Sequence, residues 1–138
     1  METQVNISVK LIKELEFGFL NKKNIDLENI TLNFSVNTLV EKENDSFTLD
    51  TKVTFNDKND NSELVHITVS NVFLVQNIAQ FETDGVFNIP DGILVTFLSL
   101  SISHTRALLA KNTAGSVYES LYIPVVNPTE IANQIFKK

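Results

Sequence analysis

Apolar and polar residues alternate over much of the first 89 positions, which predicts β-strands because successive side chains of a strand point to opposite faces. The first apolar row is broken only at Lys13 and consists of Val5, Ile7, Val9, Leu11, Leu15, Phe17 and Phe19. Strict alternation gives such a strand one apolar and one polar face. Since the run is long for one strand, we expect a bulge or bend at residues 12–13.

Three further alternating sets follow, and polar turns separate them. The sets are Ile30, Leu32, Phe34 and Val36; then Phe47, Leu49, Val53 and Phe55; then Val65, Ile67, Val69, Phe73 and Val75. The turns lie at 41–45 and 56–61, and residues 20–29, which show no regular pattern, are predicted to form a connecting loop. Short turns between consecutive strands predict an antiparallel meander, because parallel pairs need long crossovers.

The pattern changes to helical spacing after Pro90. Asp91 can cap a helix that begins near Gly92 and runs to about Ala114, where Gly115 can stop it. Residues 93–102 are apolar on nearly every side, so this helix should be buried all round. One four-stranded sheet cannot cover it on two sides, so we expect a second subunit on the other.

The predicted contacts of this helix with the second subunit are Phe97, Leu98 and Ser101. After the helix, Pro124 and Pro128 bracket an extended segment, and a short helix is predicted at 129–136 with Asn127 near its cap. The sequence therefore predicts a single α+β domain over residues 1–138. It consists of a four-stranded antiparallel meander sheet, followed by a long helix and a short C-terminal helix on one face.

Composition and charge narrow the functions. The 138 residues carry a net charge of -6 and no cysteine, which argues against nucleic-acid binding and excludes disulfides and thiolate metal sites. The N-terminal segment lacks the features of a signal peptide, and the apolar stretch at 93–102 is far short of the ~20 residues that span a bilayer. We expect a cytoplasmic protein without membrane insertion.

No motif for catalysis, phosphate binding or metal binding is present, so we expect neither an enzyme nor a cofactor. His66 alternates with apolar neighbours and is predicted on the polar face of its strand, without further metal ligands. His104 is interpreted either as a helix polar residue with its hydrogen bonds satisfied or as a pH-sensitive contact with an acidic group across a subunit interface. Arg106 is expected to bind a carboxylate.

Several segments resemble the SecB family of protein-export chaperones. Residues 9–17 (VKLIKELEF) are similar to its first strand, 30–34 (ITLNF) to its second and 72–75 (VFLV) to the end of its fourth. Residues 123–128 (IPVVNP) are similar to its lead into the last helix, while 103–106 (SHTR) share only the arginine with the corresponding family region. The family's central helix usually carries a proline break that this chain lacks, so its two helical pieces should be merged here.

The resemblance implies a homo-oligomer, a dimer or a dimer of dimers, that holds unfolded polypeptides on apolar grooves without nucleotide. The residues it implies for peptide binding are Phe17, Ile30, Leu32, Phe34 and Leu64; the alternative is that they form the inward face of the sheet. It also implies contact with the translocase ATPase through Glu14, although the family's second acidic position falls at His66 and the sequence ends at Lys138 without the family's polar tail. The second hypothesis is therefore a SecB-like protein with one dedicated partner, such as a toxin–antitoxin-associated chaperone, uncoupled from export.

Overall fold

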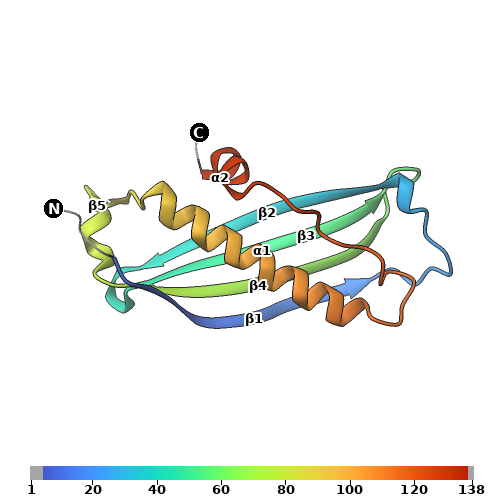
Figure 1. The fold of residues 1–138 in the computed structure, drawn as a ribbon, viewed down its shortest axis with the longest axis horizontal. Helices are drawn as coiled ribbons and strands as arrows, with labels where there is room; N and C mark the ends of the chain where they lie inside the picture. Colours follow the sequence, from blue (N-terminus) through green and yellow to red (C-terminus); the bar gives the residue numbers. More distant parts are fainter. Residues whose placement is uncertain (1–4, 137–138) are drawn as a thin grey trace.

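Four long antiparallel strands form the sheet on which the rest of the chain packs (Figure 1). The structure is a computed structural model that describes residues 5–136. Its strands are β1 (Ile7–Phe19), β2 (Ile30–Glu41), β3 (Ser46–Asp57) and β4 (Glu63–Val75). The sheet order is β1-β4-β3-β2, so β2, β3 and β4 form a meander, whereas β1 pairs with β4. The predicted four-stranded meander therefore holds for three strands and is wrong for β1. The loop at 20–29, which ends in the 3-10 helix η1 (Leu27–Asn29), therefore connects the two outer strands.

Two register shifts in β1 replace the single irregularity predicted at 12–13. They lie between Val9 and Leu11 and between Glu14 and Glu16. A bulge adds one residue on one strand, so the residues beyond it change face. The two shifts lie on either side of the predicted position. The apolar row did not indicate which residues of β1 would be the inserted residues of the bulges.

The first shift places Leu11 on the face of the sheet away from the helices. Val9 pairs with Phe73, a strand residue that faces the long helix, whereas Leu11 pairs with Val72, which points to the opposite face. Leu11 is 49% exposed there. The prediction that Leu11 shares one apolar face with the rest of the row is therefore wrong.

The long helix α1 (Asp91–Thr113) crosses the sheet diagonally as one continuous helix (Figure 1). It starts one residue before the predicted start, with Pro90 at the cap, so Asp91 is the first helical residue and not the cap. Gly115 follows its end with a φ of +80°, a conformation that glycine adopts without strain. The 3-10 helix η3 (Ile78–Phe81) and a hairpin of β5 (Glu82–Thr83) and β6 (Val86–Phe87) precede it and were not predicted.

The C-terminal helix α2 (Pro128–Phe136) packs against α1, on the same side of the sheet. Its first turn is capped as predicted, because Asn127 Oδ1 accepts hydrogen bonds from the backbone N–H groups of Thr129 (2.9 Å) and Glu130 (3.3 Å). The predicted fold class, α+β with a four-stranded antiparallel sheet, a long helix and a short terminal helix, is confirmed.

The core lies between α1 and the sheet, and aromatic stacking is central to it. The ring of Phe97 lies parallel to that of Phe73, with centroids 4.0 Å apart and an interplanar angle of 7°. Phe47 of β3 lies 5.2 Å from the same ring. Phe97, Leu98 and Ser101, which were predicted to contact a second subunit, are fully buried inside the single chain. Their assignment to an oligomer interface is therefore corrected to the core.

The outward face of α1 carries small and polar residues instead, with Thr96, Ser103, Ala107 and Ala110 exposed. One chain therefore buries Phe97, Leu98, Ile102 and Leu109, whereas other apolar residues of the helix, such as Leu94 and Leu100, stay partly exposed. By length and mean hydropathy (1.5), α1 also meets the requirement for crossing a membrane, which the shorter apolar stretch at 93–102 did not suggest. Such a helix is weak evidence for a membrane protein, because core helices of this kind pass the same test, and here Phe97, Ile102 and Leu109 pack on the sheet.

Candidate functional site

An apolar pocket of about 380 Å³ opens at the end of the sheet where β2 begins. Its walls come from the 20–29 loop, β2, β3 and the segment after α1. The lining residues are Leu27, Ile30, Leu32, Phe55, Ser120, Leu121, Tyr122 and Pro124. None of these side chains is charged, so the pocket suits apolar groups. Two of the residues predicted to bind peptide, Ile30 and Leu32, lie in it.

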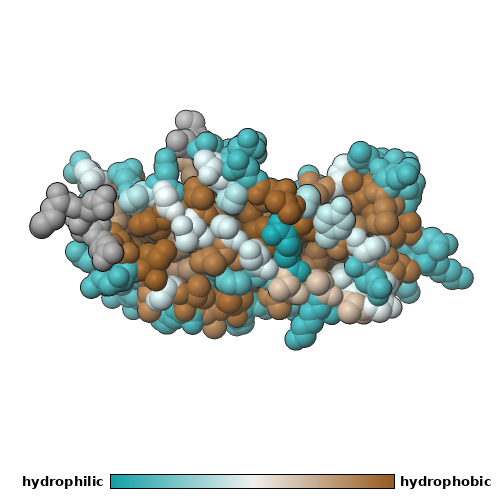
Figure 2. All heavy atoms as spheres, viewed as in Figure 1, coloured by the Kyte–Doolittle hydropathy of each residue, from teal (hydrophilic) through white to brown (hydrophobic). Residues whose placement is uncertain are grey.

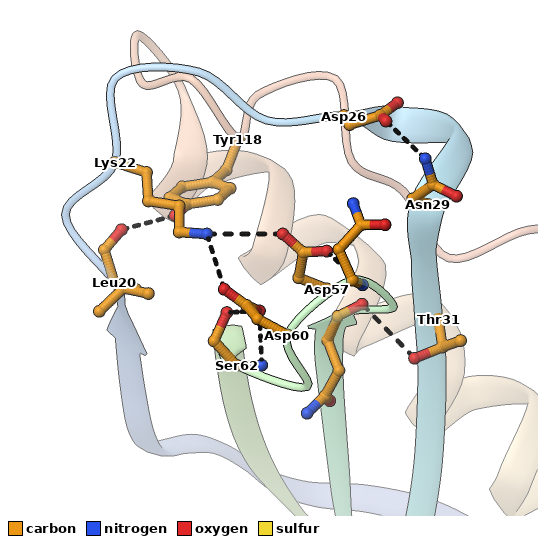
Figure 3. Close-up of polar contacts among 11 residues, drawn as sticks. Leu20, Lys22, Asp26, Asn29, Thr31, Asp57, Asp60, Ser62 and Tyr118 are labelled. Carbon is orange, nitrogen blue, oxygen red and sulfur yellow. Dashed lines mark hydrogen bonds and ion pairs between the residues drawn. The ribbon is translucent and has the colours of Figure 1, made fainter.

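The loop wall of the pocket is held by polar contacts at the end of the sheet (Figure 3). Lys22 Nζ lies 3.5 Å from Asp57 Oδ2 and 3.7 Å from Asp60 Oδ2, which joins the loop to the β3–β4 turn. Hydrogen bonds from the Ser62 side chain and backbone lower the pKa of Asp60, so this carboxylate is charged at neutral pH. The loop that carries Leu27 is thus fixed to the sheet.

Tyr118 connects the loop to the segment after α1. Its hydroxyl donates a hydrogen bond of 2.5 Å to the backbone oxygen of Leu20, which Figure 3 shows beside Lys22. Burial raises the pKa of Tyr118, against an opposing effect of Lys22, so the phenol keeps the proton that it donates. Both irregular walls of the pocket are therefore tied together across the end of the sheet.

The segment at residues 116–127, here called the strap, returns from the end of α1 to α2 over the sheet (Figure 1, orange to red). Arg106 of α1 fixes it: Nε donates to the backbone oxygen of Ile123 (2.8 Å) and Nη2 to that of Pro124 (2.6 Å). The expectation that Arg106 binds a carboxylate is therefore wrong, because its partners are backbone carbonyls. Its role is to position the wall that contains Pro124.

A second pocket, of about 570 Å³, lies at the other end of β2. It is lined by Thr38, Val40, Phe47, Phe87, Asn88, Ile89, Pro90, Asp91, Leu94 and Phe136. Phe34 and Val36 lie between the two pockets on the same face of β2 and are half-buried. We call the two pockets and these two residues the β2 groove. Figure 2 shows apolar side chains gathered in several patches over this face, including the right-hand end, where β2 begins.

The structure separates the five residues predicted to bind peptide. Phe17 is on β1, at the far edge of the sheet, three strand spacings or about 14 Å from β2. There its ring lies 6.1 Å from that of Phe19, outside the groove. Leu64 is buried in the core and has no accessible surface for a ligand. Ile30, Leu32 and Phe34 remain together along β2.

Sequence reasoning missed most of the first pocket. Leu27, Leu121 and Tyr122 lie in irregular segments, where no periodic pattern indicates which side chains point inward. The run of apolar residues at 121–123, just before the segment that Pro124 and Pro128 bracket, was the available signal.

Glu14, predicted to contact a translocase, points toward α1, where its carboxylate accepts a hydrogen bond from Asn112 Nδ2.

His66 lies on the face of the sheet away from α1, between the carboxylates of Glu63 (3.1 Å) and Glu16 (3.7 Å). It lies over Gly18, where an added Cβ would come within 2.5 Å of the imidazole. Within residues 5–136 no group of three or more histidine, cysteine or acidic residues could hold a metal ion.

His104 makes its contact within the chain. Its Nδ1 lies 2.5 Å from Oδ1 of Asn71, a buried residue of β4, which fits a neutral ring that donates from Nδ1. This matches the interpretation of His104 as a satisfied helix residue. Burial lowers the pKa of His104 below its usual 6.5, because the charged form loses hydration.

His104 should therefore make the fold less stable in mild acid. Above pH 6.5 the residue is neutral in both states and its contribution is complete; below that pH the unfolded chain binds a proton more readily, so stability falls. We expect the urea midpoint of the wild type to fall more between about pH 7.5 and about pH 5.5 than that of His104→Gln. Parallel pH profiles for the two proteins would contradict this role of His104.

No family model matches this sequence. The search of curated proteins also finds no match. Among solved structures, the chain resembles the Mycobacterium tuberculosis SecB-like chaperone Rv1957, in complex with a ChAD peptide from the Rv1956 HigA1 antitoxin. The TM-score is 0.58 at 8% identity over 87% of this chain and 90% of that chain. A protein of unknown function from Streptococcus agalactiae matches with a TM-score of 0.33 at 13% identity, over 91% of this chain and 98% of the other. The likeness to the mycobacterial protein concerns the fold, which is SecB-like.

Proposed function

We propose that this chain is an ATP-independent holdase, which binds unfolded polypeptides in the β2 groove and has no catalytic activity. The observation that carries the proposal is the first pocket, where Ile30 and Leu32 remain half-exposed beside an uncharged opening at the sheet edge. An uncharged, largely apolar pocket of this kind takes up the side chains that an unfolded protein exposes. The SecB-like fold supports the proposal, because the mycobacterial protein with this fold is described as a chaperone in complex with a peptide.

Replacement of Leu27 by aspartate should weaken this activity. Leu27 lines the first pocket and is 52% exposed, so a charge there disturbs the groove and leaves the core intact. Leu11→Asp is the matched control, because Leu11 is equally exposed but lies on the opposite face of the sheet. The measurement is light scattering by an unrelated unfolding protein at near-stoichiometric amounts of each variant. We expect Leu27→Asp to require roughly tenfold more protein for the same suppression, as for a loss of about 1.4 kcal/mol in binding. Equal suppression by the two variants would place binding elsewhere.

The second candidate is a SecB-like protein with one dedicated partner that is not coupled to the translocase ATPase. The bond from Asn112 to Glu14 favours it, because a translocase contact through this exposed carboxylate would have to compete with that bond. The peptide bound to the mycobacterial protein comes from an antitoxin, a single defined protein, and this candidate requires a partner of that kind. Suppression of several unrelated clients would support the general holdase; suppression of one alone would support the dedicated partner.

The proposal includes a cytoplasmic homo-oligomer, either a dimer or a dimer of dimers. Because Phe97, Leu98 and Ser101 are buried within one chain, a second subunit would contact the outward face of α1 instead. The native mass measured in the same experiment tests this part of the proposal.

A further inference from the structure

The loop that joins β1 to β2 crosses the end of the sheet with few polar attachments. Its two ends are held by backbone hydrogen bonds, because the Leu20 N–H donates to the oxygen of Leu64 (2.8 Å) and the Lys58 N–H donates to that of Asn29 (2.8 Å). Between these two bonds, only Lys22 makes a hydrogen bond or ion pair to a described residue outside the loop. The polar hold on the middle of the loop therefore depends on one side chain.

Lys22 lies between two carboxylates, one at the end of β3 and one in the turn to β4 (Figure 3). Its Nζ is 3.5 Å from Asp57 Oδ2 and 3.7 Å from Asp60 Oδ2. The side chains of Lys22 and Asp57 are 28% and 18% exposed, so this pair is partly withdrawn from water, whereas that of Asp60 is 57% exposed. Mobile ions screen partly exposed charges of this kind. A rise in ionic strength at neutral pH therefore weakens the hold on the loop.

The same loop presents Leu27 to the first pocket. Leu27 is 52% exposed, so its own packing gives the loop little hold. Ile25 is half-buried against the core and is the apolar anchor of the loop. The ion pairs of Lys22 are the polar anchor, and they act on the part of the loop that precedes Leu27. Without them, Leu27 can move away from the pocket wall while the strands of the sheet keep their pairing.

We propose that Lys22, Asp57 and Asp60 form an ionic latch that couples ionic strength to the affinity of the first pocket. This inference rests on the proposed function and adds how the same pocket is regulated. With the latch closed, the wall that contains Leu27 is formed before a ligand arrives; with the latch open, binding must first reorder the loop, which lowers the affinity. Salt does not screen apolar contacts, and excluded salts strengthen them. Weaker binding of an uncharged ligand at higher salt therefore reports the latch.

The first test needs no ligand and follows chymotryptic cleavage after Leu27, which requires the loop to open, by mass spectrometry of the fragments. We expect Lys22→Met to be cleaved roughly fivefold faster than the wild type at about 0.05 M NaCl, as for the loss of two partly exposed ion pairs. The wild type should approach the rate of Lys22→Met at about 1 M NaCl, where the Debye length is about 3 Å. Lys23→Met is the matched control, because Lys23 is exposed and forms no ion pair with the described residues, and it should be cleaved at the wild-type rate.

The second test measures binding of a probe, a capped synthetic peptide of leucine and serine residues that carries no charge. We expect its affinity for the wild type to fall roughly threefold between about 0.05 M and about 1 M NaCl. Lys22→Met should bind it roughly fivefold more weakly than the wild type at the lower concentration and should lose nothing more at the higher one. Asp57→Asn should also weaken binding, and the double variant should bind no more weakly than Lys22→Met alone, because both changes remove the same contact.

The two tests separate this inference from the proposed function. If Lys22→Met and Lys23→Met are cleaved equally fast, no latch exists and the inference is overturned, whereas the holdase proposal stands. If Lys22→Met is cleaved faster but binds the probe as the wild type does, the loop opens without effect on the pocket, and the inference is again overturned. If the wild type binds the probe at neither salt concentration, the proposed function fails and takes the inference with it, even where the cleavage rates differ.

Discussion

Phe97→Asp is expected to leave the chain unable to fold, rather than to release a folded subunit from an assembly. Phe97 is 1% exposed and stacks on Phe73, with Phe47 beside it. Removal of a phenylalanine from such a site costs about 3–5 kcal/mol. An unpaired carboxylate in the same place adds several kcal/mol more, against a typical total stability of about 5–15 kcal/mol.

The measurement for Phe97→Asp is the far-ultraviolet circular dichroism spectrum together with the native mass. Ala107→Asp is its control on the same helix, since Ala107 is exposed on the outward face. We expect the control to keep a native spectrum, and any change in its mass would locate a subunit contact on that face. A folded Phe97→Asp protein with reduced mass would mean that α1 is sandwiched between subunits and that its packing within one chain is wrong.

The parts of the fold that follow from local patterns were predictable. The rows that begin at Ile30, Phe47 and Val65 became β2, β3 and β4, because a sheet with one buried face requires apolar residues at every second position. Pro90 and Gly115 marked the ends of α1 to within a residue or two, also for local reasons. The ring of Pro90 fixes its φ before the helix, and Gly115 can adopt the positive φ that ends it.

The parts that depend on distant contacts were not predictable. Nothing local to β1 indicates that it pairs with β4, about 60 residues later, and its two bulges appear only once that partner is known. Local patterns also do not indicate which serine of α1 is buried. Ser99, Ser101 and Ser103 look alike in sequence, but only Ser101 is buried between α1 and the sheet. Which face of an apolar helix is covered is decided by the sheet and the strap, so the sequence alone assigned Phe97, Leu98 and Ser101 to a subunit contact although they lie in the core.

The candidate site also has a part that local patterns predict and a part that they do not. Ile30 and Leu32 were predicted because they belong to a strand pattern, whereas the opposite wall comes from the strap, which has no period. Arg106 shows why such a wall escapes prediction: its partners are backbone oxygens, which any residue supplies. A charged side chain on a helix suggests a carboxylate partner, yet here it donates to carbonyls that no strand or helix pairs.

Arg106→Met should therefore loosen the strap and weaken the groove. The variant keeps an apolar stem but loses the donors to the oxygens of Ile123 and Pro124, of which Pro124 lines the first pocket. Because Arg106 is only half-buried, we expect a loss of about 2 kcal/mol in the free energy of unfolding, less than two fully buried charged hydrogen bonds would give. Hydrogen exchange at 121–127 should accelerate by roughly tenfold and peptide affinity should fall by a similar factor, because the open pocket must be reordered on binding.

Lys111→Met is the matched control for Arg106→Met, because it removes the same charge from an exposed position of the same helix. We expect its exchange and peptide affinity to stay at wild-type values. Arg106→Lys should fall between the two, since one ammonium group cannot reproduce the planar fork that reaches two successive carbonyls. If Lys111→Met and Arg106→Met weakened peptide binding equally, loss of positive charge from α1 would be the cause. If only Arg106→Met acts, the strap is a mobile wall whose position sets the affinity of the groove, and one side chain of α1 controls it.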